Sequence, residues 1–244
     1  MTDFHSHILP GIDDGARNTE TSLEMLRASR EQGVKRIIAT PHFYADSDEP
    51  DRFLQRRNRS MEKLRAAMGD EEFPEIILGA EVTYFDFMGE CEELKKLTIE
   101  GTRILLLEMP MISWTPRMYG EVQKIYNNLG LIPIIAHIDR YIEIFRDRRI
   151  ARVFDEIPVV IQASSSFFTK RKTSGLARRM LKKGSIHLIG SDMHNMTTRP
   201  PDLRSGFDII EKKNGKIAVE YIEKWENAVL SGKRRNVYKL LGLV

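Results

Sequence analysis

Nine histidine and carboxylate side chains are spread along this chain, most of them shortly after a run of apolar residues. The set contains five of the six histidines in the sequence. The nine residues are His5, His7, Asp14, His42, Glu81, Glu108, His137, Asp192 and His194. Histidine nitrogen and carboxylate oxygen are the usual ligands of Zn²⁺, Mn²⁺ and Fe²⁺ in proteins. The sequence therefore predicts a metalloenzyme.

Two short segments, His5–His7 and Asp192–His194, carry a ligand-type side chain at both ends. Alternate residues of a strand point to the same face, so each segment can direct two ligand atoms at one cation. The structural alternative is a strand end with two chance histidines, or an aspartate helix cap beside a surface histidine. Two such pairs near opposite ends of one chain favour metal binding for both.

The remaining candidates follow apolar runs singly, and Glu81 and Glu108 are the most informative of them. A charge directly after a buried strand either reaches solvent or needs a compensating partner, because an unpaired buried charge is costly. His42 and His137 end apolar runs in the same manner. A carboxylate such as Glu81 can bridge two cations about 3.5–4 Å apart, as in multi-metal enzymes that act on phosphate esters.

Short apolar runs alternate with longer amphipathic segments along the whole chain. The predicted strands are Thr2–His5, Arg36–Thr40, Glu75–Gly79, Arg103–Leu107, Ile132–Ala136, Val159–Ala163 and Ile186–Gly190. The clearest predicted helices are Thr19–Gln32, Asp51–Met68, Pro116–Asn128 and Thr173–Lys183. Strands that alternate with helices pair in parallel through right-handed crossovers, which predicts an α/β fold.

The placement of the candidate ligands decides between an open sheet and a closed one. They follow six of the seven predicted strands. An open doubly wound sheet concentrates its ligands at a switch point between a few strands, whereas a closed barrel brings nearly all carboxyl ends to one mouth. We therefore expect a TIM-like barrel of seven strands, built as a single domain over residues 1–244.

Composition and charge exclude several classes of protein. The 244 residues are 41% hydrophobic and 30% charged, and the formal net charge of +3 is too small to indicate a nucleic acid partner. No secretory signal is recognisable, and no apolar run approaches the roughly 20 residues of a membrane-spanning helix. The single cysteine, Cys91, excludes an internal disulfide and fits a reducing compartment. We expect a cytoplasmic protein that is not inserted in a membrane.

Two arginines follow candidate ligands closely and could bind phosphate. Arg140 lies three residues after His137, and Arg199 lies five residues after His194. The planar guanidinium suits bidentate contact with phosphate oxygens. A chain this rich in arginine must leave most of its guanidiniums in solvent, which is the alternative for both.

Other conspicuous residues are expected to have no role in catalysis. His187 lies inside a predicted strand, which favours a structural histidine. Five arginines between positions 52 and 65 are most simply a solvated helix face, although the stretch follows His42 and could flank the mouth; they are Arg52, Arg56, Arg57, Arg59 and Arg65. Cys91 has no arginine six residues later, which excludes the mechanism of cysteine phosphatases. The phosphate-binding GxxxxGK[ST] loop and the GxSxG elbow are also absent.

Several short motifs, in this order, resemble those of the PHP superfamily, which is named for polymerase and histidinol phosphatase. They are HSH at His5–His7, DDG at Asp13–Gly15, TPH at Thr40–His42, GAE at Gly79–Glu81, AHIDRY at Ala136–Tyr141, SDMHN at Ser191–Asn195 and RPP at Arg199–Pro201. The chain is similar in particular to the capsular-polysaccharide type of bacterial protein-tyrosine phosphatase, the CpsB/YwqE type. The resemblance implies a distorted (β/α)₇ barrel with the active site at the C-terminal mouth of the strands.

The resemblance also implies three divalent ions, usually Mn²⁺, with Fe and Zn as alternatives. One ion would be held by His5, His7, Glu81 and Asp192, a second by Glu81, Glu108 and His137, and a third by Asp14, His42 and His194. Arg140 and Arg199 match the phosphate-contacting arginines of the family. The segment Gln162–Ser165 stands where an asparagine is common, with Ala163-Ser164 at a position of the mouth that bears on substrate preference.

The implied activity is that of a metal-dependent protein-tyrosine phosphatase, in which metal-bound hydroxide attacks phosphorus. The leaving group would be a phenolate, from a phenol of pKa about 10, which needs less help from a general acid than an alkoxide does. The sequence offers no dedicated general acid. The implied partner is a tyrosine-phosphorylated protein, namely a membrane-associated bacterial tyrosine kinase in capsule or exopolysaccharide synthesis.

Three alternatives stay open on the sequence. The first is another PHP enzyme, a phosphoesterase that acts on histidinol phosphate or on nucleotides. The second is an amidohydrolase-like barrel, which also begins with two histidines spaced by one residue. The third is a non-catalytic metal-binding barrel with a regulatory role. The AHIDRY motif and the SDMHN-to-RPP segment favour the tyrosine phosphatase.

Overall fold

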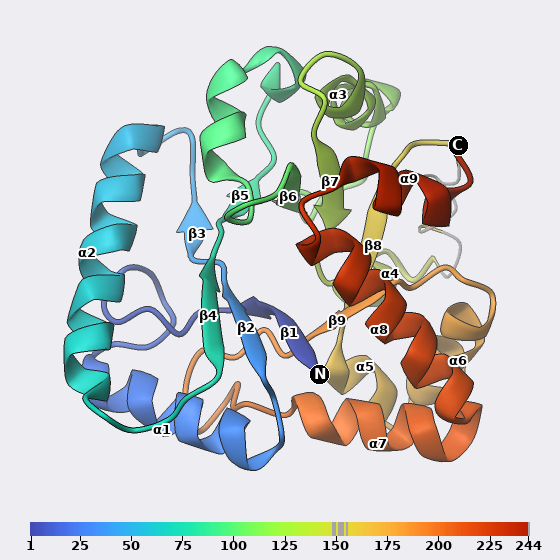
Figure 1. The fold of residues 1–244 in the computed structure, drawn as a ribbon. Helices are drawn as coiled ribbons and strands as arrows, with labels where there is room; N and C mark the ends of the chain where they lie inside the picture. Colours follow the sequence, from blue (N-terminus) through green and yellow to red (C-terminus); the bar gives the residue numbers. More distant parts are fainter. Residues whose placement is uncertain (148–149, 151–153, 155, 244) are drawn as a thin grey trace.

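The computed structural model describes residues 1–147, 150, 154 and 156–243 of the chain. Its strands are β1 (Thr2–Ser6), β2 (Arg36–Ala39), β3 (His42–Phe43), β4 (Glu75–Leu78), β5 (Glu81–Thr83), β6 (Ile104–Glu108), β7 (Ile132–Ile135), β8 (Val160–Ser164) and β9 (Leu188–Gly190). Its α-helices are α1 (Thr19–Glu31), α2 (Pro50–Met68), α3 (Pro116–Asn127), α4 (Ile138–Phe145), α5 (Ser165–Thr169), α6 (Ser174–Lys182), α7 (Leu203–Asn214), α8 (Lys216–Leu230) and α9 (Arg234–Leu241). The paired strands run parallel and alternate with helices, which confirms the predicted α/β class (Figure 1).

Two of the predicted strands are interrupted rather than continuous. Strands β2 and β4 end within one residue of the predicted Arg36–Thr40 and Glu75–Gly79, but the prediction missed β3 and β5, which each begin after a gap of two residues. Pro41 has no N–H to donate, so the ladder breaks at that point. The amide of Glu81 nevertheless donates to the carbonyl of Pro41 at 3.0 Å, which keeps the two interrupted strands side by side.

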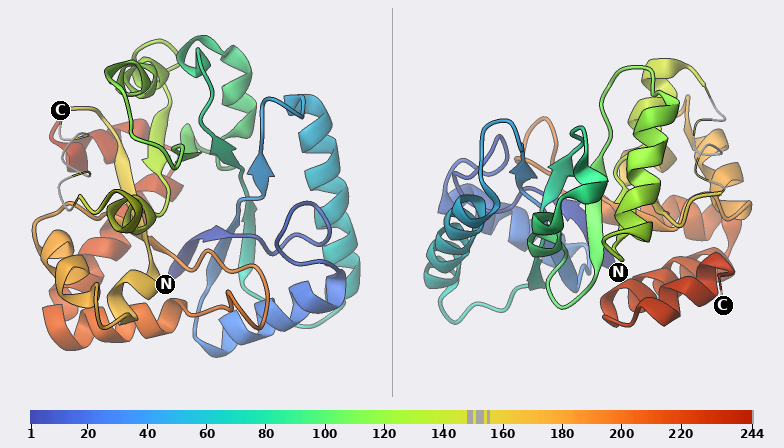
Figure 2. Two further views of the ribbon diagram at one scale, coloured as in Figure 1. Left: turned by 180° about the vertical axis from the view of Figure 1, so that it is seen from behind. Right: turned by 90° about the horizontal axis from the view of Figure 1, so that it is seen from above.

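The strands form a curled parallel sheet with helices on its outside (Figures 1 and 2). Hydrogen bonding gives two sheets, with the orders β1-β2-β4 and β3-β5-β6-β7-β8-β9. The segment after β9 returns to the first strand, because the amide of Asp192 donates to the His5 carbonyl at 2.8 Å. The amide of His7 likewise donates to the Met193 carbonyl at 2.9 Å. The first and last strands of the chain therefore meet.

Successive residues of the strands bury two different hydrophobic cores. In β6, Leu105 and Leu107 pack with the core beneath the surrounding helices, whereas Ile104 and Leu106 pack in a second core. Glu108 continues the series 104, 106, 108 at the carboxyl end of the same strand. The period of two residues along a strand therefore carries this carboxylate to the end of the second core.

The second core is covered by the last two helices of the chain. Trp225 and Val229 of α8 and Val237 of α9 pack against strand residues such as Phe4. Figure 1 shows α8 and α9 lying across one side of the sheet. Within the described part of the chain, no helix combines the length and apolar character needed to cross a membrane.

The helices begin at residues that the sequence favours for that position. The side chain of Asn18 accepts from the amide of Thr21 at 2.9 Å and starts α1. Thr115 precedes α3, whose first residue is Pro116, and accepts from the amide of Met118 at 3.4 Å. The four predicted helices are found with ends that differ by one residue.

Candidate metal centre

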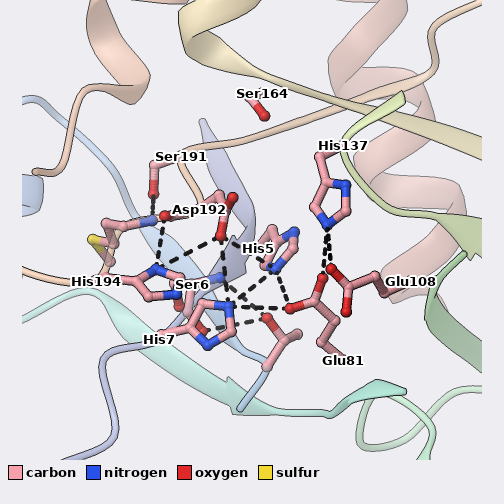
Figure 3. Close-up of polar contacts among 12 residues, drawn as sticks. His5, Ser6, His7, Glu81, Glu108, His137, Ser164, Ser191, Asp192 and His194 are labelled. Atoms are coloured by element: carbon pink, nitrogen blue, oxygen red, sulfur yellow. Dashed lines mark hydrogen bonds and ion pairs between the residues drawn. The ribbon is translucent and has the colours of Figure 1, made fainter. Parts of the chain in front are cut away.

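The fold brings all nine predicted ligand residues into one cluster at the carboxyl ends of the strands. Figure 3 shows His5, His7, Glu81, Glu108, His137, Asp192 and His194 of this cluster. Seven of them form three overlapping groups in which the ligand atoms lie within 4.8 Å of one another. These groups are His7, Asp14, His42 and His194; His5, His7 and Glu81; and His42, Glu81 and Glu108. His137 and Asp192 join the cluster through contacts with members of these groups.

Glu81 lies at the centre of the cluster and contacts four histidines from three different segments. Its Oε2 is 3.0 Å from His5 Nε2, 3.2 Å from His7 Nε2 and 3.2 Å from His42 Nδ1. Its Oε1 is 2.9 Å from His137 Nε2. Burial alone would raise the pKa of Glu81, but the charge of His5 and the hydrogen bonds from histidine outweigh it and hold that pKa well below its usual range. Glu81 is therefore ionised and shared.

A second carboxylate, Glu108, approaches the cluster from the end of β6. Its Oε1 is 3.4 Å from His137 Nε2, and its Oε2 accepts from Thr83 Oγ1 at 3.2 Å. Burial opposes protonation of His137, yet its hydrogen bonds to Glu108 and Glu81 raise its pKa to about 9. A proton held so strongly between two carboxylates marks a place where a cation would be stabilised instead.

The most exposed member of the cluster is Asp14, whose side chain is 66% exposed. Its Oδ1 lies 3.6 Å from His42 Nε2 and 3.4 Å from His194 Nε2. Burial lowers the pKa of His42, and it lowers that of His194 to about 4. Both rings are therefore neutral at pH 7, which is the form in which imidazole binds a metal.

Several buried atoms of the cluster have no hydrogen-bond partner, although such atoms are almost always satisfied in folded proteins. They include Glu81 Oε2, His42 Nδ1 and His194 Nε2. Atoms of this kind are costly to leave unpaired. A set of nitrogen and carboxylate oxygen donors without thiolate suits divalent cations such as Mn²⁺, Fe²⁺ and Zn²⁺. The residues present therefore fit such cations.

Backbone irregularities occur at or beside several residues of the cluster. Asp192 and His137 have positive φ angles of 56° and 29°, which are rare for residues other than glycine. The register of β1 with β2 shifts between Asp3 and Ser6, and such bulges often lie beside active sites. Because of this irregularity, the simple alternation that motivated the His5–His7 pair does not by itself explain their convergence.

Three supporting residues were missed from the sequence. Asp13 accepts from His7 Nδ1 at 2.8 Å and from the amide of His42 at 3.0 Å. Gln162 Oε1 accepts from the amide of His137 at 2.7 Å and lies 3.4 Å from His5 Nδ1. Asp3 is buried and accepts from the amide of Ser191 at 2.8 Å. Asp13 could have been found from the DDG motif. Gln162 and Asp3 could not, because their partners lie far away in the sequence, by 25 and 157 residues for Gln162 and by 188 for Asp3.

Two glycines allow the backbone to approach the cluster closely. A Cβ at Gly15 would lie 2.3 Å from the carbonyl oxygen of His7, and one at Gly190 would lie 2.6 Å from His5 Cβ. Side chains at either position would displace the histidine pair of β1. These glycines are therefore required by the site rather than by a turn.

Arg140 and Arg199 both contact Asp192 at the edge of the cluster. Arg140 Nη2 donates to Asp192 Oδ2, and Arg199 Nη2 lies 2.6 Å from Asp192 Oδ1. A cavity of about 270 Å³ beside them is lined by both arginines, Asp192, Ser164 and Lys170. The charges of His5, Arg140 and His7 overcome the effect of burial and keep the pKa of Asp192 below its usual range. Two guanidiniums therefore converge where the cluster meets solvent.

His187 lies outside the cluster, as expected, and the prediction for Arg57 needs a correction. His187 Nδ1 accepts from the amide of Ile161 at 2.8 Å, and its ring packs 4.3 Å from that of Trp225. The prediction that Arg57 is solvated was wrong, because it is buried and donates to the Gly79 carbonyl at 2.9 Å. Its guanidinium thus satisfies a backbone carbonyl in the gap between β4 and β5.

The fold and the cluster together define an α/β protein with a histidine and carboxylate site of the kind that binds divalent cations. The chain belongs to the family described as "Capsular polysaccharide synthesis, CpsB/CapC", whose model matches residues 1–230. This membership confirms the resemblance noted from the motifs.

Relatives of similar length carry a consistent name. Tyrosine-protein phosphatase CpsB of Streptococcus pneumoniae is 30% identical over 88% of this chain and 91% of its own length. Tyrosine-protein phosphatase YwqE of Bacillus subtilis is 30% identical over 88% of this chain and 85% of its own length.

Two solved structures are similar to this one. One belongs to a set of crystal structures of YwqE from Bacillus subtilis and CpsB from Streptococcus pneumoniae, which are described as unique metal-dependent tyrosine phosphatases. It superposes on this structure with a TM-score of 0.81. It is 25% identical and the match covers 96% of this chain and 95% of the other. Histidinol phosphate phosphatase from Lactococcus lactis superposes with a TM-score of 0.54 at 15% identity, over 92% of this chain and 93% of that one, and shares the fold.

Proposed function

We propose that this chain is a metal-dependent protein-tyrosine phosphatase. The observation that carries the proposal is the cluster of nine ligand-type residues around Glu81, with two arginines converging at its edge. Its relatives named as tyrosine-protein phosphatases match nearly nine tenths of the chain. The geometry suits hydrolysis of a phosphate ester, because it pairs a cation site with guanidiniums that fit phosphate oxygens.

The scaffold of the proposed enzyme is a single domain, a distorted (β/α)₇ barrel. Counting β2 with β3 and β4 with β5 as interrupted strands gives seven strands in order around the ring. The hydrogen bonds from Asp192 to His5 and from His7 to Met193 support closure between the last strand and the first. Closure accounts for the meeting of ligands from all round the sheet at one mouth.

Three divalent ions, Mn²⁺ by preference, are the proposed cofactors. His5, His7, Glu81 and Asp192 would hold the first, Glu81, Glu108 and His137 the second, and Asp14, His42 and His194 the third. The contacts of Glu81 with His5, His7 and His137 support its place between two ions. His42 lies near Glu81 and Glu108 as well as Asp14, so it stands at the boundary between the second and third sets.

The charge of the site supports a role for cations in substrate binding. Asp14, Glu81, Glu108 and Asp192 contribute −4, and Arg140 and Arg199 contribute +2, so the residues alone carry −2 and repel a phosphate dianion. Three divalent cations would add +6 and bring the site to +4. Bound cations would also lower the pKa of a water molecule from 15.7 to near 7, which supplies a nucleophile at neutral pH.

The residues of the chain would then bind and orient the phosphoryl group. Asp192 holds both guanidiniums beside the cluster, so Arg140 and Arg199 are positioned to contact the phosphate oxygens, where charge accumulates in the transition state. Asp13 holds the tautomer of His7 by accepting from its Nδ1, which leaves Nε2 for the cluster. A phenolate leaving group departs readily, so the proposed reaction needs no dedicated general acid.

The proposed substrate is a tyrosine-phosphorylated protein, a membrane-associated bacterial tyrosine kinase, in the cytoplasm of a cell that makes capsule or exopolysaccharide. This proposal is supported by the family, which is described as acting in capsular polysaccharide synthesis. Fold similarity to histidinol phosphate phosphatase makes hydrolysis of that phosphate the alternative to test.

A substrate panel with and without Mn²⁺ tests the function. Phosphotyrosine peptide, phosphoserine peptide, histidinol phosphate and a nucleotide would be compared by phosphate release. We expect turnover of the phosphotyrosine peptide in Mn²⁺, loss of turnover after chelation and recovery when Mn²⁺ is returned. A preference for histidinol phosphate or the nucleotide would overturn the substrate class, and full activity in metal-free protein would overturn the mechanism.

A further inference from the structure

A second cavity adjoins the metal cluster on the side of α2. Its volume is about 500 Å³, nearly twice that of the cavity beside Arg140 and Arg199. The residues that define it here, as the Tyr44 cavity, are Asp14, His42, Tyr44, Asp48, Arg52 and Arg56. Its size is within the range of cavities that bind ligands.

The inner end of the Tyr44 cavity is formed by the cluster itself. Asp14 and His42 line the cavity and belong to the proposed third ion site. The ring of Tyr44 stacks on that of His42, with centroids 5.2 Å apart and an interplanar angle of 25°. Tyr44 is nevertheless 46% exposed, so one part of its ring is free to contact a substrate. A group bound here would lie directly beside a phosphate at the cluster.

The outer wall of the cavity carries two arginines and one aspartate, whereas Asp13 and Asp14 lie at its inner end beside the proposed ion site. Arg52 and Arg56, one helical turn apart on α2, both pair with Asp48: Arg56 Nη2 donates to its carboxylate, and Arg52 Nε lies 3.9 Å from it. The Asp48 side chain is only 8% exposed, whereas those of Arg52 and Arg56 are 74% and 44% exposed. One buried carboxylate thus orients two guanidiniums that face solvent.

We infer that the Tyr44 cavity binds an acidic side chain of the protein substrate, close to the phosphotyrosine. This inference rests on the proposed function and names a preference of the same site. In the bound complex, Arg52 and Arg56 contact the carboxylate of the substrate's acidic side chain, and the exposed part of the Tyr44 ring contacts the neighbouring peptide. The five arginines between positions 52 and 65 thus divide into two that face the cavity, one that is buried and two on the outer surface of α2.

The experiment compares two phosphotyrosine peptides that carry either glutamate or glutamine on both sides of the phosphotyrosine. Their kcat/KM values would be measured in Mn²⁺ for the wild type, Arg52→Ala, Arg52→Glu and the double variant Arg52→Ala/Arg56→Gln. Arg59→Ala is the matched control, because Arg59 is exposed on the same helix, does not line the cavity and its loss changes the net charge equally. 4-Nitrophenyl phosphate reports the activity that needs no peptide contact.

We expect the wild type to prefer the glutamate peptide by roughly two- to five-fold for each arginine, the range of exposed ion pairs. Arg52→Ala should reduce the preference, the double variant should abolish it and Arg52→Glu should reverse it. Arg59→Ala should behave as the wild type, and 4-nitrophenyl phosphate should be hydrolysed at the same rate by the wild type, Arg52→Ala and Arg59→Ala. The preference should shrink between about 0.05 M and about 0.5 M salt, because exposed charges are screened.

Equal turnover of the two peptides by the wild type would overturn the inference, as would an equal loss of preference in Arg59→Ala and Arg52→Ala. In both cases hydrolysis of 4-nitrophenyl phosphate would leave the proposed phosphatase function intact. If neither peptide nor 4-nitrophenyl phosphate is hydrolysed in Mn²⁺, the proposed function itself fails and this inference fails with it.

Discussion

Replacement of Asp13 by asparagine should weaken metal binding although Asp13 is not one of the proposed ligands. Its side chain is 6% exposed and accepts from His7 Nδ1 at 2.8 Å. It also accepts from the amides of Gly15 and His42, both at 3.0 Å. Asp13→Asn keeps the size of the side chain and one carbonyl acceptor but removes the charge that fixes the His7 ring.

The size of the effect follows from these contacts. Burial opposes ionisation of Asp13, but its hydrogen bond and charge attraction with His7 and its backbone donors lower its pKa to about 2, from 3.8. That difference corresponds to about 2.5 kcal/mol of interaction with the ionised carboxylate, at about 1.4 kcal/mol per pKa unit. Carboxylates that support metal-bound histidines are worth about 10–100-fold in metal affinity, which agrees with this value. We expect about 30-fold weaker Mn²⁺ binding.

Titration calorimetry with Mn²⁺ on chelator-treated protein would measure the affinity, and metal analysis would give the stoichiometry. Asp86→Asn is the matched control, because Asp86 is exposed and pairs with Arg117 at 3.2 Å. Saturating Mn²⁺ should restore much of the kcat of Asp13→Asn. Wild-type affinity in Asp13→Asn would refute the reasoning, and so would equal losses in both variants.

Three further outcomes are expected. Asp192→Ala and His194→Ala should lose activity and bound metal, with folding intact by circular dichroism. His187→Ala removes a side chain packed on Trp225 and should keep its activity and its metal. Comparable kinetic losses in all three variants would contradict the ligand assignment. Arg199→Lys should lower kcat/KM on a phosphotyrosine peptide by roughly 30- to 1,000-fold, from about 2–4 kcal/mol of lost contact, with metal content unchanged; lost metal would mean that Arg199 acts through Asp192 instead. Burial lowers the pKa of His187 to about 4 from 6.5, so the stability it contributes is complete above pH 6.5 and is lost as the pH falls through 4. Urea unfolding should show about 2 kcal/mol less stability at pH 5 than at pH 7 from this group, and the same pH dependence in His187→Asn would exclude it as the cause.

The nine residues predicted as ligands lie together in the structure, and the sequence could single them out because metal chemistry restricts which side chains can serve. Histidine and carboxylate at the end of an apolar run are conspicuous, since a buried strand otherwise excludes them. The α/β class followed from alternating strand and helix patterns, and the structure confirms it. The strand β3 after Pro41 was not predicted, because the apolar run ends at Thr40 and a two-residue strand leaves no pattern in the sequence.

The supporting contacts could not be predicted, because they join segments that are far apart in the chain. Gln162 contacts His137 and His5 across 25 and 157 residues, and nothing in its local sequence indicates either partner. Arg57 reads as one of several arginines on a polar helix, and only packing against the β4–β5 break makes it buried. Such contacts depend on how helices lie on the sheet, which local patterns do not specify.

By itself, the sequence determined which atoms are available for metal binding and that they stand at the ends of successive strands. Side-chain chemistry and the period of two residues along a strand are local properties, so they can be predicted from the sequence. The tertiary structure alone decided that Glu81 is shared by four histidines, that Asp192 holds two arginines, and that Arg52 and Arg56 face a cavity beside His42. These relations depend on the curl of the sheet and the positive φ angles at His137 and Asp192. Both arise from packing the whole chain at once, and no single segment encodes them.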